Sequence, residues 1–291
     1  MRLLLLRHLV ALLERVHPEW TGPLAEALFI TPPRHAPPTR EREYLRGFAP
    51  LKIPFPGGDL QAYRRGEGPR VLLLHGWGGR AGQMRAFATA LADAGFCAVA
   101  LDAPAHGGSP GRRASIPSFA AALHAAEAHL GPIHGVIGHS LGGISTLAAL
   151  ADGLSARRAV VIAAPAHPRR YYRLLLGHLG VAEARWSELE SAFERRVGRR
   201  WDEVEGPALA RRAGRPLLVI HDQEDREVPL TEAEATAAAS SEAQLLATAG
   251  LGHRRILKDP GVVRAAVRFM GGEPCGPETL EAELAYPDLR A

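Results

Sequence analysis

Short apolar segments of strand length recur at a steady spacing between residues 70 and 248. Each segment is almost entirely apolar, as expected of a parallel strand that is buried on both faces of a sheet. The inner strands are therefore predicted at residues 70–75, 96–102, 133–137, 158–163, 216–221 and 243–248.

The stretches between these segments have the length and the alanine content of helices. They cover residues 81–94, 118–130, 140–153, 231–240 and 259–270. Alternating strands and helices predict an α/β fold with a mostly parallel central sheet and helices on both faces. A Pro-Gly-Gly-Asp turn at 56–59 lies between two further apolar segments. Residues 51–55 and 60–64 are therefore predicted to form an antiparallel hairpin that opens the sheet.

The alternation stops once, over about fifty residues between 166 and 214. This segment has amphipathic stretches at 171–179 and 186–197 but no strand pattern, so we interpret it as a helical insertion between two strands. Residues 31–40 are rich in proline and are interpreted as an extended connector. The predicted division is an N-terminal helical extension with its connector at 1–49, a core at 50–165 and 215–272, the helical insertion at 166–214 and a C-terminal tail at 273–291.

The first twenty residues combine leucines with basic side chains. Their longest apolar run, 3–6, ends at Arg7, which is too short for a signal sequence or a membrane span. Leucines at 5, 9, 12 and 13 predict an amphipathic helix. We expect this helix to pack on the main domain, and attachment to a membrane surface or a partner is the less favoured alternative.

Composition narrows the class of protein further. The chain has 291 residues, of which 46% are hydrophobic and 23% are charged, so a disordered or fibrous protein is excluded. Cys97 and Cys275 are the two cysteines, which excludes a disulfide framework and a cysteine-based zinc site and fits a cytoplasmic location. The net charge of +4 comes from arginines that alternate with acids, so no nucleic-acid surface is predicted. The oligomeric state is left open.

The strongest chemical signal is a G-x-S-x-G motif at residues 138–142. It follows a predicted strand and precedes a predicted helix, and a strand-to-helix turn this sharp needs both of its glycines. The turn lifts Ser140 clear of the sheet and places it at a helix N-terminus, which favours developing negative charge. Ser140 is therefore the candidate nucleophile.

A serine nucleophile needs a base, and the base needs an acid to orient it. His253 follows the predicted strand at 243–248, and acidic residues follow the strand at 216–221. Both groups would reach the same carboxyl edge of the sheet as Ser140, where open α/β sheets bind their ligands. The glycine-rich segments HGWGG at 75–79 and DAPAHGGS at 102–109 follow two more strands. We expect their histidines, His75 and His106, to brace these loops.

These motifs, in this order, resemble those of the α/β-hydrolase fold family over residues of about 50–270. The resemblance implies that Ser140 is the nucleophile, His253 the base and Asp225 the acid of a D-x-x-V-P pattern. Asp222 stands where the family has glycine, so Asp222 and Glu224 remain alternative acids. The resemblance also implies backbone N–H donors to the oxyanion at Leu141 and Trp77, and places the insertion as a helical cap over the active site.

The predicted reaction is hydrolysis of carboxylic esters of small-to-medium apolar acyl groups through an acyl-enzyme. It requires no cofactor and no metal, and its partner is a small-molecule ester. His139, Trp77, Tyr171 and Tyr172 are expected to contact the substrate. The same triad would serve a thioesterase, a C–C bond hydrolase or a perhydrolase, and the same fold hosts slow-turnover ligand receptors.

Overall fold

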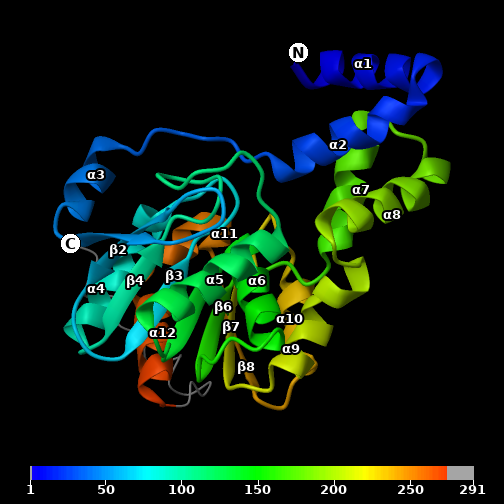
Figure 1. Ribbon diagram of the computed structural model, residues 1–291. Helices are drawn as coiled ribbons and strands as arrows, with labels where there is room; N and C mark the ends of the chain where they lie inside the picture. Colours follow the sequence, from blue (N-terminus) through cyan, green and yellow to red (C-terminus); the bar gives the residue numbers. More distant parts are fainter. Residues whose placement is uncertain (1, 274–291) are drawn as a thin grey trace.

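An eight-stranded sheet forms the centre of the molecule (Figure 1). The computed structural model describes residues 2–273 and the side chains from Arg7 onward, so almost all of the predicted C-terminal tail, with Cys275, lies outside the described residues. The strands are β1 Ala49–Ile53, β2 Leu60–Arg65, β3 Arg70–Leu74, β4 Cys97–Leu101, β5 Gly135–His139, β6 Arg158–Ile162, β7 Leu217–Asp222 and β8 Ala243–Thr248.

The strands lie in the order β1-β2-β4-β3-β5-β6-β7-β8. The predicted hairpin is present, with Leu51 opposite Ala62, and β2 also runs antiparallel to β4. All other neighbours are parallel. The strand predicted at 133–137 begins two residues later and runs on to His139, because His139 still pairs with Ile162 of β6.

Helices cover both faces of the sheet, as the sequence predicts. Leu72 and Leu74 of β3 point into one core, and Val71 and Leu73 point into the other. The first core contains α5 Ile116–Leu130, α6 Leu141–Ala151, α9 Gly206–Ala213 and α10 Leu230–Ala238. The second contains α4 Arg85–Asp93 and α12 Pro260–Gly271. Alternation along the strand thus divides the apolar side chains between two layers of helices.

The segment between β6 and β7 is helical, with α7 Pro168–Leu179 and α8 Trp186–Val197 ahead of α9. Four aromatic rings pack this inserted segment against the N-terminal helix α2 Thr21–Ile30. This aromatic cluster consists of Phe29, Tyr172, Phe193 and Trp201. The ring centroids of Phe193 and Trp201 lie 4.9 Å apart, and those of Phe29 and Tyr172 lie 5.1 Å apart. Such pairs contribute about 0.5–1.5 kcal/mol each beyond the burial of their area.

The first helix packs chiefly on the inserted helices and not, as predicted, on the sheet domain (Figure 1). Helix α1 Arg2–Val16 contacts α7, and α2 contacts α7 and α8. Val10 is fully buried in this arrangement, whereas Leu9 and Leu12 are half exposed. Leu13 is half-buried, so the packing side of α1 is centred on Val10 and Leu13 and only partly matches the expected leucine face. Within the described residues, no helix has both the length and the apolar character needed to cross a membrane.

The connector after α2 is fastened to the loops that follow β3 and β4. The Arg34 guanidinium donates to the carbonyl oxygens of Ala105, at 2.9 Å, and Ser109, at 2.8 Å. Helix α3 Thr39–Leu45 then carries Glu41, whose carboxylate accepts a hydrogen bond of 2.8 Å from Arg80. Both side chains of this ion pair are largely buried. The connector thus lies against the loops at the carboxyl ends of β3 and β4.

Candidate active site

Ser140 occupies a strained turn between β5 and α6. Its φ of 51° and ψ of −119° lie in a region that residues other than glycine rarely adopt. A Cβ atom on Gly142 would stand 2.4 Å from the carbonyl oxygen of Leu74, and one on Gly138 would stand 2.4 Å from the carbonyl oxygen of Gly142. Both glycines of the motif are therefore required by close backbone packing, as the sequence predicts.

The structure brings His253 and Asp225 together. His253 lies in the short helix α11 Gly252–Arg255, and its Nδ1 is 2.7 Å from Oδ2 of Asp225. The other carboxylate oxygen accepts hydrogen bonds from the backbone N–H groups of Glu227, at 2.8 Å, and Val228, at 2.9 Å. Burial alone would raise the pKa of Asp225, but the hydrogen bonds from His253 and from these N–H groups lower it overall. The carboxylate is thus ionised and able to orient the imidazole.

The two alternative acids lie elsewhere. The Asp222 carboxylate is fully buried and accepts hydrogen bonds from the Thr248 hydroxyl, at 2.8 Å, and from the N–H groups of Leu251 and Glu224, at 3.0 Å each. Burial would raise the pKa of Asp222, but its hydrogen bonds from the loop lower it overall. Asp222 therefore ties the loop after β7 to the loop that carries His253. The Glu224 side chain is exposed.

His139 does not line the pocket, contrary to expectation. It is 5% exposed, and its ring centroid lies 4.8 Å from that of His253. Its Nε2 lies 2.9 Å from the backbone carbonyl oxygen of His253, so this nitrogen carries the proton and donates. Burial, followed by the nearby His253, lowers the pKa of His139 to about 3. β5 continues through His139, and the side chain of His139 is buried against the loop that carries His253. This neutral histidine therefore supports His253 through the hydrogen bond to its backbone carbonyl.

The loop histidines brace the backbone, as predicted. His75 donates from Nδ1 to the carbonyl oxygen of Gly76, at 2.7 Å, and accepts at Nε2 from the N–H of Ala103, at 3.1 Å. His106 accepts at Nε2 from the N–H of Gly78, at 3.0 Å. The next N–H, of Gly79, donates to Gly76. The backbone N–H groups of Gly78 and Gly79 are thereby fixed, and this holds the loop that carries Trp77.

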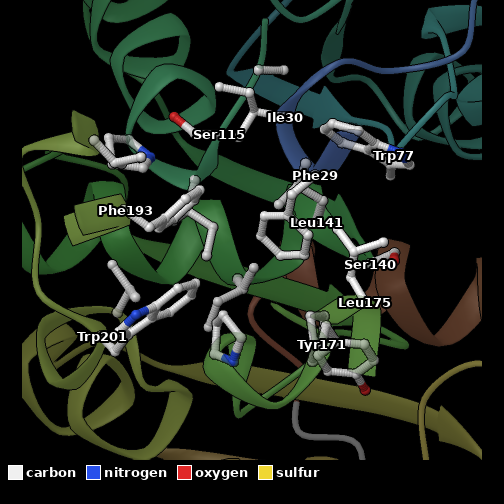
Figure 2. A pocket seen from close by; sticks show the side chains of 18 of the residues that line it. Phe29, Ile30, Trp77, Ser115, Ser140, Leu141, Tyr171, Leu175, Phe193 and Trp201 are labelled. Atoms are coloured by element: carbon white, nitrogen blue, oxygen red, sulfur yellow. The ribbon is translucent and has the colours of Figure 1, made fainter. Parts of the chain in front are cut away.

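Ser140 and His253 line one cavity of about 380 Å³ (Figure 2). This volume is within the range of about 300–1,000 Å³ that is usual for small-molecule sites. Trp77 and Tyr171, which are expected to contact the substrate, both line the cavity. Its other walls are mostly apolar and include Leu28, Phe29, Ile30, Leu141, Ile144, Leu175, Phe193, Val197 and Trp201. Among residues 2–273, no group of three or more His, Cys, Asp and Glu side chains is placed to hold a metal ion.

Tyr172 does not reach the cavity, although it was expected to contact substrate. It is 1% exposed and lies within the aromatic cluster, because neighbouring residues of a helix point about 100° apart and Tyr171 takes the cavity side. Sequence reasoning also missed the cavity residues of α2. The apolar run at 27–30 just before the proline-rich connector was the available signal, but no pattern in it indicates contact with a site more than a hundred residues away.

Comparison with known proteins supports the fold. The serine aminopeptidase family S33 matches residues 68–201. A pimeloyl-[acyl-carrier protein] methyl ester esterase from Chromobacterium violaceum is 41% identical over 81 residues, which are 27% of this chain and 30% of that protein. The chain thus spans less than a third of the length of this curated relative.

Two solved structures show the same fold at low identity. A serine hydrolase from Cycloclasticus zankles superposes with a TM-score of 0.61 at 18% identity, over 78% of this chain and 99% of that chain. An esterase from Rhodococcus sp. ECU1013 superposes with a TM-score of 0.58 at 20% identity, over 77% and 98%. Together with the sheet order, these likenesses confirm the predicted fold class.

The buried, neutral His139 predicts a specific loss of stability in acid. Its folded pKa of about 3 lies below the ordinary value of 6.5, so the unfolded chain binds the proton more tightly. This contribution to the free energy of unfolding is complete above about pH 6.5 and is lost as the pH falls towards 3. At pH 5 the loss amounts to about 2 kcal/mol. Between pH 8 and pH 5, the free energy of unfolding of His139→Asn should therefore fall by about 2 kcal/mol less than that of the wild type.

Urea unfolding at both pH values measures this difference. His35→Asn, at an exposed histidine, is the matched control and should behave as the wild type. An equal loss in His139→Asn and the wild type would show that His139 is not held neutral.

Proposed function

We propose that this chain, which has the α/β-hydrolase fold, is a serine hydrolase that cleaves carboxylic esters. The main support for the proposal is the way in which the side chains of Ser140, His253 and Asp225 lie together. Ser140 and His253 line a single apolar cavity, and the buried Asp225 carboxylate holds Nδ1 of His253 at 2.7 Å. A serine, a histidine and an orienting acid in this relation form the machinery of acyl transfer.

In the proposed first step, Nε2 of His253 takes the hydroxyl proton of Ser140 while Oγ attacks the ester carbonyl carbon. The C=O bond opens to an oxyanion, and Asp225 stabilises the imidazolium that forms. The C–O bond to the alcohol then breaks, and the alcohol leaves with the proton from His253. Water repeats the sequence on the acyl-enzyme, so the carboxylic acid is released and Ser140 regains its proton.

Two backbone N–H groups are proposed to receive the oxyanion. Leu141 is the first residue of α6, where an N–H has no acceptor within the helix and the helix dipole is positive. Trp77 lies in the loop whose following N–H groups, at Gly78 and Gly79, are already engaged with His106 and Gly76. One such donor is typically worth about 2.7–4 kcal/mol of barrier.

The proposed substrate is an ester of a small-to-medium apolar acid. The cavity is mostly apolar, and the helical insertion at 166–214, as the proposed cap, contributes Tyr171, Leu175 and Phe193 to its wall. The curated relative's name, a methyl ester esterase, points to the same bond class. Apolar walls favour an acyl chain through its methylenes, and each one that is buried gives about 0.8 kcal/mol.

Replacement of the nucleophile tests the reaction class. Ser140→Ala should abolish ester hydrolysis and labelling by a fluorophosphonate probe, while melting changes little because a methyl group fits in place of the hydroxymethyl group. Ser187→Ala, at an exposed serine of α8, is the matched control and should label as the wild type. Activity of Ser140→Ala above about a hundredth of the wild type would contradict the assignment.

Exchange of the acids tests which carboxylate orients the base. Asp225→Asn should lower turnover by about 10⁴-fold, because the amide favours the wrong imidazole tautomer. Glu224→Gln should leave turnover unchanged, since that side chain is exposed. Asp222→Asn should chiefly lower the melting temperature, because Asp222 accepts three hydrogen bonds within the loops. Turnover that depends on Asp222 or Glu224 more than on Asp225 would refute this choice of acid.

A series of p-nitrophenyl esters, run beside acyl-CoA substrates, tests the substrate class. The specificity constant kcat/KM should rise with acyl length to an optimum at about four to eight carbons and then fall, as methylenes fill the cavity and then exceed it. An optimum at about twelve carbons or more would indicate an open, lipase-like groove. A large preference for acyl-CoA would instead indicate a thioesterase.

A further inference from the structure

We propose that the N-terminal helix α2 is a wall of the substrate pocket and that Phe29 limits how far an acyl chain extends from Ser140. The inference rests on the proposed function and adds a specificity-determining residue to it. Leu28, Phe29 and Ile30 line the same cavity as Ser140 and His253. All three precede the residues that match the S33 family, so this wall is an addition to the matched region.

Phe29 stands between Ser140 and the aromatic end of the cavity (Figure 2). Its ring centroid lies 5.6 Å from that of Phe193 and 6.4 Å from that of Trp201, and both of those residues also line the cavity. Figure 2 shows Phe29 close to Leu141, with Phe193 and Trp201 on the side away from Ser140. An acyl chain that leaves Ser140 along Leu141 and Ile144 therefore meets the Phe29 ring before it reaches the end of the pocket.

Helix α2 is held firmly enough to act as a fixed wall. At its C-terminal end, the carbonyl oxygen of Ile30 accepts a hydrogen bond of 2.7 Å from the N–H of Ala114. Beyond it, Arg34 holds the connector on the loop after β4. On its other side, Glu26 lies 3.5 Å from Arg196 of α8. These contacts attach α2 both to the core and to the inserted helices.

Helix α2 also packs closely on α8 near its first turn. A Cβ atom on Gly22 would lie 3.0 Å from a side-chain carbon of Leu189, which is tighter than an ordinary van der Waals contact. With α2 held by these contacts, the depth of the pocket depends on the side chain at position 29.

The test compares acyl-length profiles of the wild type, Phe29→Ala and Phe29→Leu. Removal of the ring opens apolar space beside Phe193 and Trp201, so the optimum of Phe29→Ala should move at least two carbons longer than that of the wild type. Each methylene that gains apolar surface is worth about fourfold in kcat/KM, so a ten-carbon ester should gain about tenfold or more relative to a four-carbon ester. Phe29→Leu should lie between the two. Trp20→Ala is the control, since Trp20 is 61% exposed, lies outside the cavity and immediately precedes the same helix.

A second measurement reports on the pocket without turnover. The change in tryptophan fluorescence when saturated fatty acids of four to fourteen carbons bind beside Trp77 and Trp201, measured in Ser140→Ala and in Ser140→Ala with Phe29→Ala, gives chain-length profiles of Kd. The double variant should favour chains at least two carbons longer. Fluorophosphonate labelling identifies a failure of the hydrolase assignment separately, because the binding profile does not require a reactive serine. Unchanged profiles, or an equal loss at every chain length in a folded Phe29→Ala protein, would overturn the role of Phe29.

Discussion

The left-handed turn at Ser140 is the constraint on which the rest of the site depends. A non-glycine residue at a φ of 51° costs about 1–3 kcal/mol, and the turn persists only because its surroundings allow no other path for the chain. Gly142 lets α6 approach the end of β3, and Gly76 lets the following loop pass Ser140, where a Cβ atom would stand 2.9 Å from the serine Cβ. The strain is thus held by backbone contacts among β3, β5 and α6.

Buried histidines stabilise the loops around this turn. Burial lowers the pKa of His75 and His139 to about 3, so both imidazoles stay neutral. In a neutral imidazole one ring nitrogen carries a proton and donates, and the other has a lone pair that can accept. His75 connects the loops after β3 and β4, and His139 supports the backbone of His253. A neutral imidazole suits this position because it offers a directed donor without the cost of burying a charge.

The apolar core on the α5 and α6 face of the sheet continues outward into the inserted helices and the N-terminal helices. The aromatic cluster joins α2 to α7, α8 and the turn that carries Trp201, and its members share contacts across segments that are distant in the sequence. The N-terminal helices and the inserted helices therefore form one packed unit above the carboxyl edge of the sheet (Figure 1). The proposed role of Phe29 follows from this unit, because the same ring belongs to the cluster and to the cavity wall.

The sheet, its hairpin and the turn that carries Ser140 could be predicted from the sequence, because these features depend on local apolar periodicity and on glycines at fixed spacing. The residues after β7 left three acids open, and the resemblance to the α/β-hydrolase pattern selected Asp225, which the structure places 2.7 Å from His253. That Tyr172 is a core residue, that His139 packs against His253 and that Phe29 lines the pocket became evident only from the packing of distant segments. Which side of a helix faces a cavity depends on how segments far apart in the chain pack together. A local sequence pattern does not predict that packing.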